Sequence, residues 1–143
     1  MSIVHMHSIK PARALTAALI LLATLHPSGA TAADTNASAQ LARWQTQAAA
    51  PGSAERGKAF FTSKHGSDLS CASCHGMPPT SQGKHASTGK SIEALAPAVN
   101  PARFTDTANV DKWFARNCKD VLARDCNALE KADVLAFLTS LKP

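Results

Sequence analysis

Two cysteines separated by two residues and followed at once by a histidine, Cys71-Ala-Ser-Cys74-His75, form the stretch with the clearest chemistry. This spacing is typical of c-type haem attachment. The thiols can bond covalently to the vinyl groups of the porphyrin, and on a tight helical turn the next side chain points at the iron. We therefore expect one haem c, attached through Cys71 and Cys74, with His75 as the proximal iron ligand.

Other binding chemistries fit less well. A thioredoxin-type redox pair needs a strand–helix–strand context, and no such alternation is visible. A zinc site needs two more ligands at short spacing, whereas Cys118 and Cys126 stand too far apart from each other. A phosphate-binding loop is excluded as well, because five residues instead of four separate Gly83 from Gly89 and no buried strand precedes them.

The three methionines exclude the usual sixth ligand of electron-carrying c-type cytochromes, a methionine from the downstream half of the chain. Met1 and Met6 fall in an N-terminal leader, and Met77 follows His75 too closely to reach the other face of the haem. The remaining candidates are Asn117, His85, His65, a lysine or an open position.

Asn117 continues an apolar stripe. One helix face carries Val110, Trp113 and Phe114 at positions i, i+3 and i+4, and Asn117 follows on the same face at i+7. A polar amide on the face that meets the haem needs a partner, and iron would be one. Alternatively, Asn117 caps the end of the helix or bonds a backbone carbonyl.

His85 is the rival ligand. It lies ten residues past His75 in a polar loop, where a surface role is more common. His65 is expected to be exposed or bonded to a haem propionate. The residues alone therefore leave both Asn117 and His85 open as the sixth ligand.

Cys118 and Cys126 follow Asn117 and lie eight residues apart. In an exported protein such a remaining pair is expected to form a disulfide, which would hold the segment of Asn117 over the haem. By chain entropy this short loop would contribute roughly 2.5 kcal/mol. Two free thiols are the alternative.

Residues 1–33 are predicted to be a secretory signal peptide. Lys10 and Arg13 precede an apolar stretch, residues 14–25, that is too short to span a bilayer as a mature helix. Small residues at 30–33 suit cleavage, and a retained membrane anchor is the alternative. Because c-type haem is attached outside the bacterial cytoplasm, we expect a periplasmic protein that contacts a membrane only through an uncleaved leader.

An N-terminal helix and linker are predicted for residues 34–52, with the helix over 36–49, and a cytochrome c domain for residues 53–143. The N-terminal helix is rich in alanine and glutamine. Leu41 and Trp44 share one of its faces, so it should pack on the domain. Its function is not readable from the sequence.

Gly57 predicts a close helix crossing. It lies in a helix that begins after the N-cap Ser53, and a glycine inside a helix usually marks close approach by another element. The last helix, residues 128–142 behind the capping box of Asn127 and Glu130, offers the partner.

The middle of the chain completes an all-α prediction. Residues 80–91 are expected to be a surface loop and 92–96 a short helix. A further helix starts at a cap on Asp106 or Thr107, and residues 118–126 link it to the last one. No strand pattern is convincing. We expect an all-α domain, with about three to five short helices around one covalent haem and the extra N-terminal helix.

Composition limits the partners. The chain has 143 residues, of which 45% are hydrophobic, and a net charge of +5, which suits one small domain. No basic run is interleaved with aromatic residues, so a nucleic-acid-binding surface is excluded. The mild positive excess favours docking on an acidic redox partner.

Taken together, these residues resemble the Sphaeroides haem protein family, small monohaem class I cytochromes c whose distal ligand is a reversibly bound asparagine. The resemblance runs from about Glu55 to the C-terminus and does not include the helix of 36–49. Its motifs are Cys71-Ala-Ser-Cys-His75, Gly83-Lys-His85, Thr88-Gly-Lys90, Asn100-Pro-Ala-Arg-Phe-Thr-Asp106, Lys112-Trp-Phe-Ala-Arg-Asn-Cys118 and Cys126.

The resemblance implies that Asn117 ligates ferric iron, with the Cys118–Cys126 disulfide beside it. It also implies that oxygen or nitric oxide binds after reduction and that a dihaem cytochrome c is the electron donor. Independently, a neutral amide oxygen is a hard ligand that suits Fe(III) better than Fe(II). Reduction should therefore open the site, with Trp113 and Phe114 as the apolar wall that sets access.

Three functions compete. The favoured one is electron transfer with reversible binding of a diatomic ligand. The second is a plain electron carrier with a permanently filled sixth position, and the third is a haem enzyme acting on a small oxygen or nitrogen species. We expect no enzyme, because Asp106 and Asp111 suit helix-start charges and Arg116 suits a propionate or surface contact.

Overall fold

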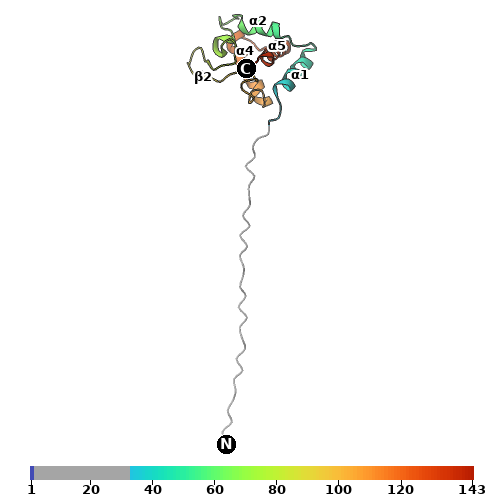
Figure 1. Cartoon of the computed structure of the whole chain (residues 1–143), viewed down its shortest axis with the longest axis vertical. Helices are drawn as coiled ribbons and strands as arrows, with labels where there is room; N and C mark the ends of the chain where they lie inside the picture. The colour runs from blue at the N-terminus through green and yellow to red at the C-terminus, as the bar shows by residue number, and fades with distance from the viewer. Residues whose placement is uncertain (2–32) are drawn as a thin grey trace. The chain divides into compact units, whose positions relative to one another are not determined.

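The computed structural model describes residue 1 and residues 33–143 (Figure 1). The signal peptide predicted for residues 1–33 thus lies outside the described residues except for its two ends. The helices in the described part are α1 (Ala37–Ala48), α2 (Ala54–Thr62), α3 (Ala72–His75), α4 (Thr107–Leu122) and α5 (Ala128–Ser140). A short antiparallel pair, β1 (Gly83–Lys84) and β2 (Ser91–Ile92), accompanies them, and the all-α fold class is confirmed. None of the described helices is long and apolar enough to cross a membrane.

Side-chain caps fix where the four longer helices begin. Ser53, Asp106 and Asn127 each accept the backbone N–H three residues further on, as predicted, and Asn36 does the same for α1. Glu130 completes the capping box with Asn127. Each cap satisfies one of the N–H groups that a helix start leaves without an intrahelical partner.

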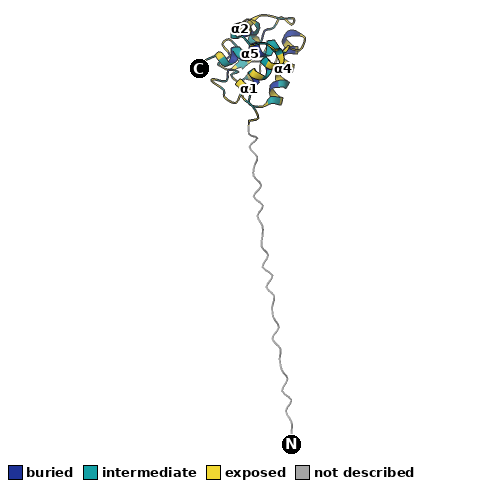
Figure 2. Ribbon diagram, turned by 90° about the vertical axis from the view of Figure 1, so that its right-hand side faces the viewer, coloured by how far each residue is buried: buried dark blue, intermediate teal, exposed yellow. Residues whose placement is uncertain are grey.

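α2 and α5 cross at Gly57, as predicted. A Cβ on Gly57 would lie 1.9 Å from the carbonyl oxygen of Asp133 and 2.9 Å from the Cβ of Phe137. The rings of Phe61 and Phe137 meet with centroids 5.5 Å apart, and Figure 2 shows buried residues where α2 meets α5. The missing side chain at position 57 is what lets the two backbones approach so closely.

α1 also packs on α5, which confirms that the N-terminal helix belongs to the packed domain. Its Trp44 is only 6% exposed. The guanidinium of Arg43 and the ammonium of Lys131 both lie over the Trp44 ring, at 4.2 and 4.1 Å from its centroid. An edge-on contact with Phe114, 6.2 Å between centroids, connects Trp44 to α4. The N-terminal helix therefore reaches two other helices.

The short helix predicted for residues 92–96 is wrong, and so is the expectation of no strands. Ile92 pairs with Gly83 in the β1–β2 ladder instead. Pro97 also disfavours helical geometry in the residue before it. The predicted loop of 80–91 therefore contains most of a small hairpin, including the strand β1.

The link predicted for residues 118–126 is also shorter than expected. α4 continues through Cys118 to Leu122 and ends where Ala123 adopts a left-handed conformation with φ of 58°. Val121 and Leu122 are buried, so the apolar face of the helix extends to its last turn. Cys118 is therefore a helical residue.

Gly57→Ala should destabilise the protein, although alanine is the better helix former. In an open helix the change would stabilise by about 1 kcal/mol, but here the new methyl group meets the backbone of Asp133. We expect a net loss of about 1–3 kcal/mol in the free energy of unfolding, as is typical of overpacking. Denaturant unfolding of the holoprotein measures it, with Lys58→Ala at an exposed position of α2 as control. A stabilised Gly57→Ala variant would contradict the close crossing.

Candidate functional site

A cavity of about 820 Å³ gathers residues that lie far apart in the sequence. Its size is within the range of cofactor and ligand sites. α2, the haem motif, the β1–β2 hairpin, residues 102–106 and α4 all contribute to its wall. The structure brings together every residue predicted for haem, iron or disulfide, since all of them line this cavity: Cys71, Cys74, His75, Trp113, Phe114, Asn117, Cys118 and Cys126.

The haem motif folds as a single helical turn. The N–H groups of Cys74 and His75 donate to the carbonyl of Cys71 at 3.2 and 3.0 Å. Just ahead of the turn, Ser70 and Ser73 each accept the other's N–H, at 3.2 and 3.0 Å. Both thiols are free, and burial raises the pKa of Cys71 to about 11, so this thiol is protonated at neutral pH. The turn thus presents thiols and an imidazole to one cavity.

His75 is a neutral imidazole at the cavity wall. Burial, and secondly the positive charge of Arg103, lower the pKa of His75 to about 4. Its Nδ1 is buried and has no hydrogen-bond partner among the described residues. Such an atom is costly unless another group engages the ring, and neutral imidazole is the form that binds metals.

Arg103 is a cavity residue that the sequence reasoning did not single out. Its Nε and Nη2 donate to the carbonyl oxygens of Ala94, at 3.0 Å, and Glu93, at 2.8 Å. These bonds hold a guanidinium at the cavity, where its further N–H groups can pair with a carboxylate. Its only sequence signal was its place inside one motif of the family resemblance.

The hairpin packs against the haem motif at Gly83. A Cβ there would lie 2.2 Å from the carbonyl oxygen of Cys74 and 2.9 Å from the Cα of His75. The N–H of Ala86 also donates to the Sγ of Cys74 at 3.3 Å. Position 83 must therefore be glycine for this contact, a role that its spacing in the sequence did not reveal.

Both candidate distal ligands line the cavity, but they are held differently. Asn117 lies half-buried inside α4, and its amide forms no hydrogen bond with any described residue. The alternative of a helix cap or a carbonyl-bonded amide is therefore wrong; the C-cap is Ala123. The Nδ1 of His85 accepts the N–H of Thr88 at 3.2 Å, which engages that ring within its own loop. Asn117 is thus the less engaged of the two.

Of four other side chains considered in the sequence, two line the cavity and two do not. Trp113 lines the cavity while 42% exposed, and Phe114 beside it is half-buried. Met77 is 44% exposed and is not part of the wall. His65 also lies outside the wall, with its Nε2 bonded to the carbonyl of Phe60 at 2.9 Å.

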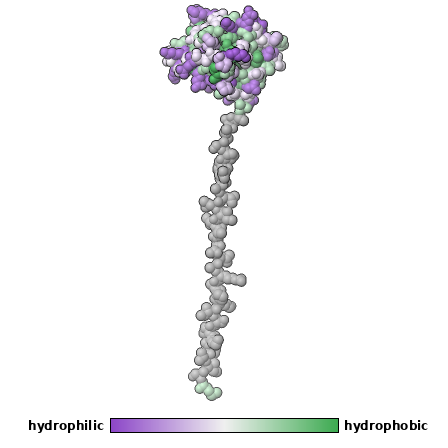
Figure 3. Space-filling view, viewed as in Figure 1, coloured by the Kyte–Doolittle hydropathy of each residue, from purple (hydrophilic) through white to green (hydrophobic). Residues whose placement is uncertain are grey.

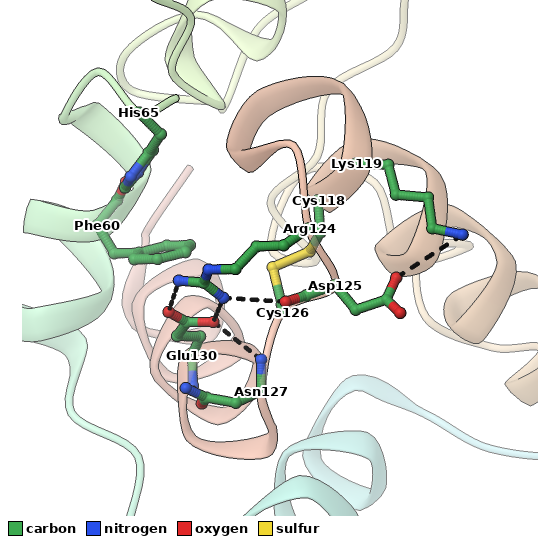
Figure 4. The surroundings of a disulfide bond; sticks show 9 residues. All are labelled: Phe60, His65, Cys118, Lys119, Arg124, Asp125, Cys126, Asn127 and Glu130. Atoms are coloured by element: carbon green, nitrogen blue, oxygen red, sulfur yellow. Dashed lines mark hydrogen bonds and ion pairs between the residues drawn. A yellow bond between two sulfur atoms is a disulfide. The ribbon is translucent and has the colours of Figure 1, made fainter. Parts of the chain in front are cut away.

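The predicted disulfide between Cys118 and Cys126 is confirmed (Figure 4). Both cysteines are buried, and their Cα atoms are 5.5 Å apart. The bond joins α4, one residue after Asn117, to the start of α5. Beside it the guanidinium of Arg124 pairs with the carboxylate of Glu130 at 2.6 and 2.9 Å.

The residues around this cavity fit a covalently attached haem. Free thiols stand at the attachment spacing, and the imidazole next to them is uncharged and has an unpartnered ring nitrogen. A guanidinium is available for carboxylates, and the α4 wall combines apolar rings with one free amide.

Comparison with known proteins identifies similar chains. A family model described as a domain of unknown function, DUF1924, matches residues 47–138. The chain is 45% identical over 130 residues to cytochrome c-type protein SHP of Cereibacter sphaeroides, covering 88% of this chain and 99% of that protein. It is 46% identical over 92 residues to cytochrome c'' of Methylophilus methylotrophus, covering 61% of this chain and 64% of that protein.

Solved structures agree with this comparison. Oxidized SHP, described as an oxygen binding cytochrome c, matches with a TM-score of 0.70 and 45% identity, over 76% of this chain and 99% of that one. Oxidized cytochrome c'' from Methylophilus methylotrophus matches with a TM-score of 0.69 and 36% identity, over 76% and 96%. This share of the chain exceeds the stretch from Glu55 onward, so the similarity extends into α1.

Glu130→Gln should make the stability less sensitive to acid. The hydrogen bond from Arg124 is the largest cause that lowers the pKa of Glu130 below its usual 4.5. The ionised carboxylate therefore stabilises the folded state above about pH 4.5, and this contribution is lost as the pH falls through the lowered pKa. Glutamine keeps the capping box but not the charge.

Thermal unfolding of both proteins between pH 3 and 7 tests this. The wild type should melt higher at neutral pH, and the difference should shrink towards pH 3. Glu55→Gln, a carboxylate that forms no ion pair in the described part of the chain, is the control. A difference that is constant across this range would contradict the assignment.

Proposed function

Because the chain belongs to the Sphaeroides haem protein family of c-type cytochromes, we propose that it transfers electrons in the periplasm and reversibly binds a diatomic ligand when its iron is reduced. It is a monohaem cytochrome that binds a ligand, and it carries covalently attached haem c. The description of the related SHP as an oxygen binding cytochrome c supports oxygen as one such ligand.

The proximal residues hold the cofactor. Cys71 and Cys74 would form the two thioether bonds, and His75 would supply the neutral imidazole for the iron. Arg103, fixed by two backbone carbonyls at the cavity wall, would pair with a haem carboxylate. When bound, the haem supplies one-electron chemistry at its iron.

The free amide of Asn117 is the observation that carries the proposal. It lines the cavity from α4 and has no hydrogen-bond partner in the part of the chain that the structure describes. Its neutral oxygen would suit Fe(III) better than Fe(II), so reduction would weaken its hold and leave a position for another ligand. Trp113 and Phe114 on the same wall favour a small apolar molecule over water.

The competing functions are less well supported. A plain carrier would need a distal ligand that stays bound in both oxidation states, which a neutral amide does poorly. An enzyme would need a free acid or base at the cavity. Of the candidates there, Asp106 accepts the N–H of Asn109 as a helix cap, Asp120 is exposed beside Arg116, and the Nδ1 of His85 accepts the N–H of Thr88.

The proposed partner is an acidic redox protein, with a dihaem cytochrome c as the electron donor that the family suggests. On the face shown in Figure 3, hydrophilic side chains surround a smaller hydrophobic group. Such a mixed surface suits a brief encounter better than a permanent complex. The net positive charge would steer this encounter.

The visible absorption spectrum of the ferrous protein, recorded before and after adding carbon monoxide, tests the function. We expect a five-coordinate high-spin spectrum that shifts when carbon monoxide is added. A low-spin ferrous spectrum indifferent to carbon monoxide would show that the sixth ligand stays bound, and the protein would then be a plain carrier.

Asn117→Ala and His85→Ala identify the distal ligand. Asn117→Ala should convert the ferric spectrum from low spin to high spin, while carbon monoxide still binds the ferrous form. His85→Ala is the matched control, because it also lines the cavity, and it should leave the ferric spectrum unchanged. The reverse pattern would assign the ligand to His85.

A further inference from the structure

The loop between α2 and the haem motif, residues 65–70, is tied to three elements; we call it the strap. Towards α2, the Nε2 of His65 bonds a carbonyl at 2.9 Å. Towards α3, Ser70 and Ser73 bond each other reciprocally. Towards α4, the connection runs through Ser67. The strap is therefore a fixed connection within the described domain.

Ser67 supplies the donors that the end of α4 needs. Its Oγ lies 2.7 Å from the carbonyl oxygens of both Asp120 and Val121, and its N–H donates to that of Val121 at 3.3 Å. The last carbonyls of a helix have no intrahelical donor. The backbone of Gly66 is close too, since a Cβ there would lie 3.2 Å from the carbonyl oxygen of Leu122.

This contact joins the two sides of the cavity. Asp120 follows Asn117 by less than one helical turn, and Ser67 precedes Cys71 by four residues. One side chain thus connects the turn that bears the distal amide to the segment that leads into haem attachment. The disulfide cannot replace this connection, because it ties α4 to the start of α5 instead.

We propose that Ser67 is a positioning residue for the distal ligand: its hydroxyl holds the last turn of α4 against the strap and so sets how fully Asn117 occupies the ferric iron. This inference rests on the proposed function of Asn117. Without the hydroxyl, α4 keeps the disulfide and the backbone bond from Ser67 to Val121 but loses the two shorter contacts that hold its last turn to the strap. The amide then meets the iron less often, and the ferric form becomes partly high spin.

Ser67→Ala in the holoprotein tests the inference. We expect the ratio of high-spin to low-spin ferric haem in the visible spectrum to rise roughly three- to tenfold, the effect of losing one hydrogen bond. The midpoint potential should rise, because the ferric state loses a ligand. Ser67→Thr keeps the hydroxyl and should restore both values.

Ser63→Ala is the matched control. That serine is also exposed and donates its hydroxyl to a helix carbonyl, of Ala59, at 2.7 Å, but it does not contact α4. Thermal unfolding of both variants compares their general loss of stability. In an Asn117→Ala background, Ser67→Ala should leave the spectrum unchanged.

The outcomes separate this inference from the proposed function. If Asn117→Ala alters the ferric spectrum but Ser67→Ala does not, or if Ser63→Ala alters it equally, the role of Ser67 is overturned and that of Asn117 stands. If Asn117→Ala leaves the spectrum unchanged, both are overturned.

Discussion

A cavity large enough for a haem separates α4 from the helices that form the core, and this separation determines how α4 must be held. α5 packs closely on α1 and α2, whereas α4 reaches that core through the ring of Phe114, through the ion pair of Asp111 with Arg43 of α1, and through contacts near its two ends. Near its start, the N–H of Thr107 donates to Asp34 at 2.9 Å. Near its end stand the disulfide and the hydroxyl of Ser67. Because a helix beside a cofactor cavity has less helix–helix burial to hold it, these covalent and polar ties add to the packing of its last turn against Phe60 and Leu69.

Burial determines the charge state of the residues in the haem motif. Removing a group from water disfavours its charged form, and the two groups buried next to each other in the haem motif respond in the expected directions. The pKa of Cys71 rises and that of His75 falls, so both are uncharged at neutral pH. Arg103 stays charged nearby and disfavours a second positive charge on His75. The imidazole is therefore available to a metal without first losing a proton.

Local patterns made the helix starts, the crossing at Gly57 and the haem motif predictable, because capping and covalent attachment depend on residues close in sequence. The predictions were wrong where distant residues decide. Ile92 joins a strand because Gly83 lies opposite it. Arg103 and Ser67 drew no attention because an arginine or a serine in a loop carries no periodic signal; only the fold places one at the cavity and the other at the end of α4. For Asn117 the sequence left iron ligation and a helix cap open, and its place inside α4 rules out the cap.

The ties on α4 also limit what the scaffold can do in a redox-dependent change of ligand. Moving an equilibrium from 1:99 to 99:1 takes about 5.5 kcal/mol, whereas one hydrogen bond contributes about 1 kcal/mol. If Asn117 is the ferric ligand, as proposed, the oxidation state of the iron must therefore supply most of the difference, through the preference of a hard amide oxygen for Fe(III). The scaffold instead sets the starting balance between bound and released Asn117, which the oxidation state of the iron then shifts. If α4 were held much more tightly, Asn117 would stay bound in both states, and if it were held much more loosely, the site would be open in both. A limited number of ties near the ends of α4 would thus let the oxidation state of the iron decide whether Asn117 is bound.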